Sequence, residues 1–166
     1  MITGPELINL SECHLAGRRI QTSLAANETV HLWRTFMPGV KSISGRMNGD
    51  FYSVRIYSAG LEMESFTPDT PFEEWAAVRI DSGARIPEDM EILLMESGLY
   101  AVFTIRGTAA DFMWSARHIY LDWLPKSGHR LDDRPHFTLM GEKYLPDDPG
   151  SEEEFWIPVR PGLNNT

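Results

Sequence analysis

The stretch EEEFWIPVR at residues 152–160 decides the fold, because FEEWAAVRI at residues 72–80 repeats its pattern. Both stretches place acidic residues, a tryptophan, small or apolar residues and a Val-Arg pair in the same order. A second matched pair lies upstream, with HLWRTFMPG at 31–39 and HIYLDWLPKSG at 118–128. Two matched pairs in the same order predict that the chain contains an internal duplication.

Two segments have the apolar period of an amphipathic helix, residues 28–37 and 109–124. Thr108 and Asp111 have the spacing of a capping box at the start of the second segment. Proline and glycine follow the apolar residues in both segments, which is typical of the end of a helix. We therefore expect two long helices at corresponding places in the duplicated units.

Each unit also contains extended stretches, one before the helix and two after it. The units, about 14–80 and about 97–161, are each predicted to fold as strand, helix, strand, strand. Together they predict one α+β domain over 1–166, with an antiparallel sheet that carries both long helices on one face. The other face of the sheet is expected to hold a ligand cleft.

Composition limits the function classes. The 166 residues are 42% hydrophobic, which is enough for one sizeable core. A net charge of −9 opposes attraction to phosphate backbones or anionic lipids, so we expect neither direct nucleic-acid binding nor membrane binding. The start of the chain has no signal-peptide pattern, so a cytoplasmic protein is expected. The single cysteine and the spacing of the five histidines indicate no metal site and no cofactor.

The elements WLP-SG, RP-F and E-WIPV carry a resemblance to a known family. They occur in order within IYLDWLPKSGHRLDDRPHFTLMGEKY (119–144) and EEEFWIPVR (152–160), preceded by YAVFTIRG (100–107). This part resembles the gyrase-inhibitor-like (GyrI-like) effector-binding domains, which occur alone or fused to DNA-binding domains in multidrug-responsive bacterial transcription regulators. The first unit resembles the family less closely, through LWRTFMPG and VRIYS, and the resemblance covers most of residues 14–160.

The resemblance implies a duplicated strand-helix-strand-strand fold, here as a stand-alone domain. It also implies a pocket between the two halves, in which an acidic residue and several aromatic residues bind small, often cationic and lipophilic molecules. Many relatives carry a glutamate directly after the phenylalanine of the RP-F element, whereas this chain has Thr138 after Phe137. A bound cation therefore needs its negative charge from elsewhere, and Glu154 and Glu73 are the candidates. The alternative is a neutral ligand.

Strand alternation places Glu154 and Trp156 on one face and Phe155 on the other, core-forming face. The repeat places Glu73 beside Trp75 in the same way. Indole rings with carboxylates suit a flat organic cation, although the indoles could instead fill ordinary core space. The predicted ligand-binding residues are Glu154, Trp156, Trp75, Glu73, Tyr57, Thr138 and Met140.

The expected function is binding of small, lipophilic or cationic aromatic molecules in a cleft between the repeats. No residue is predicted to be catalytic, but a hydrolase that uses a pocket glutamate on a strained-ring compound is an alternative. A protein inhibitor of the gyrase-inhibitor type is the second alternative, since an acidic protein can sequester a basic protein surface. The expected partner is a small-molecule ligand; a protein partner and the oligomeric state stay open.

Overall fold

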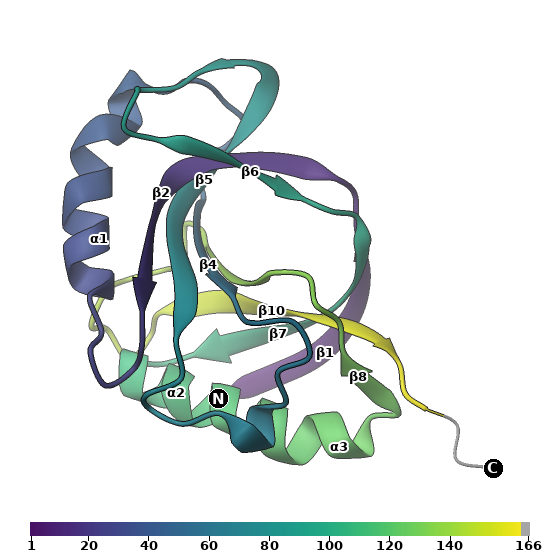
Figure 1. The fold of residues 1–166 in the computed structure, drawn as a ribbon. Helices are drawn as coiled ribbons and strands as arrows, with labels where there is room; N and C mark the ends of the chain where they lie inside the picture. Colours follow the sequence, from purple (N-terminus) through teal and green to yellow (C-terminus); the bar gives the residue numbers. More distant parts are fainter. Residues whose placement is uncertain (164–166) are drawn as a thin grey trace.

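The computed structural model describes residues 1–163, which form an antiparallel sheet with helices on one face (Figure 1). The strands are β1 Ile2–Leu10, β2 Cys13–Thr22, β3 Ser44–Arg46, β4 Phe51–Ile56, β5 Phe72–Arg85, β6 Glu91–Met95, β7 Gly98–Arg106, β8 His129–Leu131, β9 His136–Met140 and β10 Glu152–Pro161. The helices are α1 Thr29–Phe36, α2 Ala109–His118 and the short α3 Leu124–Lys126. Two 3₁₀ turns, Met37–Ser42 and Met63–Ser65, and one π-helical turn, Ile119–Trp123, complete the elements.

The strand order shows how the two halves meet. It runs β1-β7-β10-β9-β4-β5-β2-β6, while β3 pairs with β5 and β8 pairs with β10. The first half follows the order β2, α1, β4, β5 and the second half the order β7, α2, β9, β10. The halves join where β4 pairs with β9, with Ser53 opposite Thr138. The predicted α+β fold, with strand, helix, strand, strand in each half, is confirmed.

The helices begin where the sequence indicates and end in other helical turns. Thr108 and Asp111 form the expected capping box, in which the Thr108 amide donates to the Asp111 carboxylate at 2.7 Å. After His118 the chain continues as the π-helical turn and α3, so the predicted helix at 109–124 is divided. The first helix passes into a 3₁₀ turn that contains Pro38, which has no amide hydrogen to continue an α-helix.

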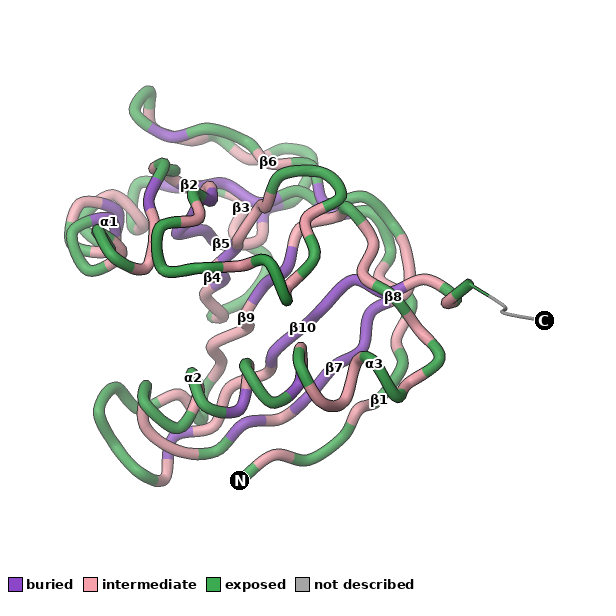
Figure 2. The backbone as a smooth tube through the Cα atoms, turned by 60° about the horizontal axis from the view of Figure 1, so that its bottom comes forward, coloured by how far each residue is buried: buried purple, intermediate pink, exposed green. Residues whose placement is uncertain are grey.

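Both long helices cover the same face of the sheet. Side chains of α1 pack with Ala76 and Val78 of β5, whereas the neighbouring Trp75 and Ala77 point to the opposite face. Helix α2 packs in the same way on β7 and β10, in a cluster that includes Phe155. Because each helix lies over the outer strands of its own half, the central strands β4 and β9 are seen between α1 and α2 (Figure 2).

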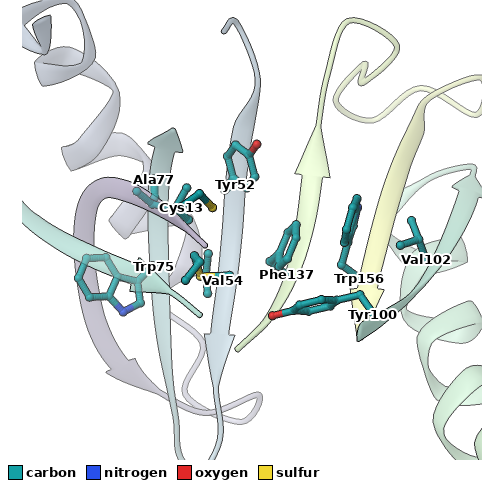
Figure 3. Close-up of a cluster of buried hydrophobic side chains, with 11 residues drawn as sticks. Cys13, Tyr52, Val54, Trp75, Ala77, Tyr100, Val102, Phe137 and Trp156 are labelled. Carbon is teal, nitrogen blue, oxygen red and sulfur yellow. The ribbon is translucent and has the colours of Figure 1, made fainter. Parts of the chain in front are cut away.

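The helix-free face is turned inward. Strand β1 continues into β2 and β6 continues into β7, while β1 pairs with β7 and β2 pairs with β6. The resulting long, bent ribbon joins the two ends of the sheet, so the strands curl into a ring (Figure 1). The enclosed face is filled by an inner core of buried side chains: Cys13, Leu15, Tyr52, Val54, Trp75, Ala77, Met95, Tyr100, Val102, Phe137 and Trp156 (Figure 3). The face on which the sequence analysis places a ligand cleft is therefore packed core.

Among residues 1–163, no helix is both long enough and apolar enough to cross a bilayer.

Candidate functional site

A cavity of about 730 Å³ lies on the helix-bearing face, between α1 and α2. Its size is in the range of cavities that hold drug-sized molecules. The sheet lines it with Ser53, Arg55, Tyr57, Thr138, Met140, Glu153 and Phe155, and the helical segments line it with Val30, Trp33, Met37, Phe112, Met113, Ala116 and Tyr120. The cavity therefore lies on the opposite face of the sheet from the predicted cleft. The two helices leave the central strands uncovered on the outer face, whereas core side chains fill the inner face.

Large apolar side chains line the mouth of the cavity and are exposed to solvent. Val30 of α1 is 65% exposed and Met113 of α2 is 60% exposed, and Met37 is also exposed. Methionine side chains are flexible and polarisable, so they adapt to ligands of different shape. Exposed apolar side chains around a concave site indicate a surface that gains free energy when an apolar ligand covers it.

Glu153 brings negative charge to the cavity wall. It lies beside Phe155 on the helix-bearing face of β10 and lines the cavity. Burial raises the pKa of the Glu153 carboxyl to about 7, and no charged neighbour among the described residues contributes to this shift. A carboxylate that is partly desolvated and has no cationic partner attracts a cation more strongly than one in water.

The other two glutamates of the run already have partners. Glu152 faces the Lys143 ammonium at 3.6 Å, and Glu154 accepts a hydrogen bond from the Trp156 indole at 3.2 Å. Neither of them lines the cavity. Of the three consecutive glutamates, Glu153 is therefore the one that lines the cavity.

A buried ion pair forms part of the cavity floor. The Glu74 side chain is fully buried, and its carboxylate accepts a hydrogen bond from Ser53 Oγ at 2.6 Å and one from Arg55 Nε at 2.9 Å. Burial raises the pKa of Glu74, and the nearby Arg55 guanidinium and the Ser53 hydroxyl oppose that shift. The Arg55 guanidinium also lies over the Phe72 ring, at 4.5 Å from its centroid. These contacts fix Arg55 beneath the cavity.

Three polar side chains separate this cavity from a second one of about 450 Å³. Tyr57, Tyr120 and His136 line both cavities. A hydrogen bond of 2.6 Å joins the Tyr120 hydroxyl to His136 Nδ1. Burial, aided by Arg55 and Arg134, lowers the pKa of His136 to about 3, so its imidazole is neutral. The π-helical turn carries Tyr120 into this position, and such turns often occur at functional sites.

The structure brings three of the predicted ligand-binding residues to this cavity. Thr138 and Met140 of β9 line it, and so does Tyr57, which directly follows β4. Thr138 lies beside Phe155 on β10 and beside Ser53 on β4, at the centre of the floor.

The other four predicted residues lie on the inner face of the ring. The Trp156 ring stacks on Phe137 with 5.0 Å between centroids, and Trp75 is almost fully buried (Figure 3). Glu73 pairs with Arg19 at 2.7 Å. The sheet separates these residues and Glu154 from the cavity, and Trp75 and Trp156 belong to the inner core.

Sequence reasoning did not select Glu153, Glu74, Arg55 or Trp33. Strand alternation placed Glu153 on the same face as Phe155, and that face was interpreted as core-forming. The repeat aligns Glu74 with Phe155, so a charged residue stands where the other half has an apolar one. That mismatch is a sequence signal for a buried charge that needs a basic partner.

Comparison with known proteins identifies the family. A family model described as integron-associated effector binding protein, Cass2, matches residues 6–159, and the chain belongs to this family of GyrI-like effector-binding domains. The transcriptional regulator BrlR of Pseudomonas aeruginosa is 27% identical over 137 residues, which cover 81% of this chain and 48% of BrlR. The chain thus spans about half the length of this relative. The expected family resemblance is confirmed.

Solved structures share the fold. SAV2435, solved in complex with tetraphenylphosphonium, is similar with a TM-score of 0.70 at 17% identity, over 95% of this chain and 94% of that one. The C-terminal domain of EcmrR is similar with a TM-score of 0.71 at 12% identity, over 95% and 98% of the two chains. The protein therefore belongs to a family of effector-binding domains and shares its fold with these two structures.

Proposed function

We propose that this domain binds lipophilic organic cations in the cavity between α1 and α2, with Glu153 as the residue that attracts the positive charge. The observation that carries the proposal is a partly buried carboxylate, without an ion-pair partner among residues 1–163, in the wall of a largely apolar cavity. Many relatives carry a glutamate at the position of Thr138, and Glu153 supplies the negative charge that Thr138 lacks.

Two physical terms favour such a ligand. Apolar and aromatic side chains from both helices, including Trp33 and Phe112, gain free energy when an apolar molecule displaces water from them. A cation near Glu153 then interacts with an ionised carboxylate in a medium of lower dielectric constant than water. Tetraphenylphosphonium, the ligand found with SAV2435, combines both properties and is a suitable probe.

The test is a titration of the protein with tetraphenylphosphonium at pH 8, measured by isothermal titration calorimetry. Glu153→Gln keeps the shape of the side chain and removes its charge, so we expect a loss of affinity on the order of tenfold or more. Glu152→Gln is the matched control, because its side chain faces Lys143 outside the cavity, and its affinity should equal that of the wild type. Equal losses in the two variants would contradict the proposal.

Hydrolysis is the second candidate function. It is favoured by the pKa of about 7 for Glu153, which suits a general acid or base at neutral pH. Incubation of the protein with small strained-ring electrophiles, followed by mass spectrometry, separates turnover from binding. If the domain is a hydrolase, Glu153→Gln should abolish product formation. If no compound that binds is converted to product, the domain binds its ligands without hydrolysing them.

A further inference from the structure

Arg55 is held in place by Glu74 and by the neighbouring Tyr57 hydroxyl, and these two partners do not use all of its hydrogen-bond donors. Its Nε–H donates to Glu74 Oε2 at 2.9 Å, and Phe72 supports the face of the guanidinium. The side chain is 34% exposed and lines the cavity. A guanidinium has five N–H donors in a planar fork, so donors remain for a ligand after the interactions with Glu74 and Tyr57.

The fold alone does not require this ion pair. Such a pair is costly, because Glu74 loses all of its contact with water and Arg55 loses part of its own. The corresponding position in the second half is Phe155, which fills the same place on the helix-bearing face with an apolar ring. An apolar residue is therefore compatible with this position, and the Glu74–Arg55 pair instead presents a guanidinium with fixed orientation to the cavity.

Arg55 and Glu153 lie toward opposite ends of the cavity floor. Arg55 is opposite His136, whereas Glu153 is level with Met140, whose partner on β4 is Phe51. Arg55 is four positions after Phe51 on β4, which corresponds to about 13 Å along the strand. The cavity thus has a carboxylate toward one end, a guanidinium toward the other and apolar walls between them.

We propose that the cavity is built for amphoteric ligands: lipophilic molecules with a cationic group that meets Glu153 and a carboxylate or similar oxyanion that Arg55 binds. The cationic half of this inference rests on the proposed function. The oxyanion half is independent of it, because a guanidinium fork matches the two oxygens of a carboxylate. Arg55 is then the residue that distinguishes an amphoteric ligand from a simple cation of the same shape.

The test uses ω-carboxyalkyl triphenylphosphonium ions with tethers of three to five methylenes, each compared with its own methyl ester. Both members of a pair carry the same cation and differ in the oxyanion. In the wild type we expect at least one acid to bind about tenfold more tightly than its ester, as for a charge-assisted, bidentate hydrogen bond. The ester should bind like other phosphonium cations.

The variant for this test is Arg55→Gln combined with Glu74→Gln. A single Arg55 substitution leaves the Glu74 carboxylate buried without its cation, whereas the double variant removes both charges and keeps the net charge of the protein. In the double variant the acid and its ester should bind equally, and the thermal melting temperature reports that the fold is retained. In Glu153→Gln both ligands should weaken, while the preference for the acid persists.

The outcomes separate this inference from the proposed function. If the esters bind and no acid binds more tightly than its ester, the amphoteric site is overturned and cation binding stands. A preference for the acid that survives in the folded double variant would assign the oxyanion to another cation, such as Arg34 at the rim, and would also overturn the role of Arg55. Absence of binding for every acid and ester would overturn the proposed function itself.

Discussion

The indole Nε1–H of Trp156 donates a hydrogen bond to Glu154 Oε1 at 3.2 Å, on the face of β10 that is turned away from the cavity. The next residue toward the N-terminus, Glu153, points to the cavity. Successive side chains of a strand point to opposite faces, so two adjacent glutamates have different surroundings and different roles. Substitutions at these two positions should therefore have different effects.

Removal of the Glu154 carboxylate should affect stability and leave ligand binding unchanged. Glu154→Ala takes the acceptor away from the Trp156 indole, and we expect the free energy of unfolding to fall by about 1 kcal/mol in urea titrations. Glu154→Gln retains an amide oxygen as acceptor and should cost less. The affinity for tetraphenylphosphonium should be the same in both variants and the wild type; a tenfold loss in either would show that the inner face takes part in binding.

Cation affinity should depend on pH around neutrality. The pKa of Glu153 is raised to about 7, so its carboxyl is largely protonated at pH 6 and largely ionised at pH 8. The ionised form attracts the cation, and the affinity for tetraphenylphosphonium should therefore increase from pH 6 to pH 8. The Glu153→Gln variant lacks this carboxyl and should give a flat profile over the same range. A wild-type profile as flat as that of the variant would exclude Glu153 as the titrating group.

The same group should make the ligand-free protein less stable at high pH. The folded-state pKa of Glu153 lies above its ordinary value, so the folded state binds the proton more tightly than the unfolded state does. The protonated Glu153 carboxyl contributes fully to stability below the pKa that it has in the unfolded chain. This contribution is lost as the pH rises toward and through 7, the folded-state pKa. Glu153→Gln should therefore be more stable than the wild type at pH 8, by about 1 kcal/mol after allowance for partial contact with solvent.

The measurement for this prediction is urea unfolding of both proteins at pH 8 and pH 5.5. The gain in the free energy of unfolding on substitution should be smaller at pH 5.5, where less of the contribution has been lost. A gain that is larger at the lower pH would reverse the sign and contradict the raised pKa.

The wall between the two cavities should be sensitive to loss of one hydroxyl. Tyr120→Phe removes the partner of His136 Nδ1 in a buried place and should lower the free energy of unfolding by about 1 to 3 kcal/mol. Tyr144→Phe removes a hydroxyl from the less buried rim of the larger cavity, so it should lower the free energy of unfolding by a smaller amount. Thermal melting of both variants makes the comparison, and equal costs would show that the hydrogen bond to His136 adds little.

Local patterns predicted much of this fold. The capping box at Thr108 and Asp111 marks the start of α2 because both partners lie within one turn. Alternation along β10 assigned Phe155 to the helix-bearing face and Trp156 to the other. Such features depend only on residues that are close in sequence, so the sequence is sufficient to predict them.

The position of the site depends on contacts that no local pattern contains. Pairing of β1 with β7 and of β2 with β6 joins residues far apart in sequence and turns the helix-free face inward. Trp75 and Trp156 become core by that closure, although their pattern with acidic neighbours also fits a binding site. Sequence reasoning did not select Glu153, because it assigned the helix-bearing face to the core. The sequence pattern of each helix does not show whether the two helices touch or leave a space between them.

Tryptophan fluorescence should locate the ligand on one face of the sheet. Of the five tryptophans, Trp33 lines the cavity, Trp75 and Trp156 lie in the inner core, and Trp114 is 66% exposed on α2. Tetraphenylphosphonium should quench part of the emission by contact with Trp33. Trp33→Phe should abolish this change, whereas Trp114→Phe should retain it. If the quenching survives in Trp33→Phe and disappears in Trp156→Phe, the ligand enters the ring of strands and the cavity between α1 and α2 is not its site.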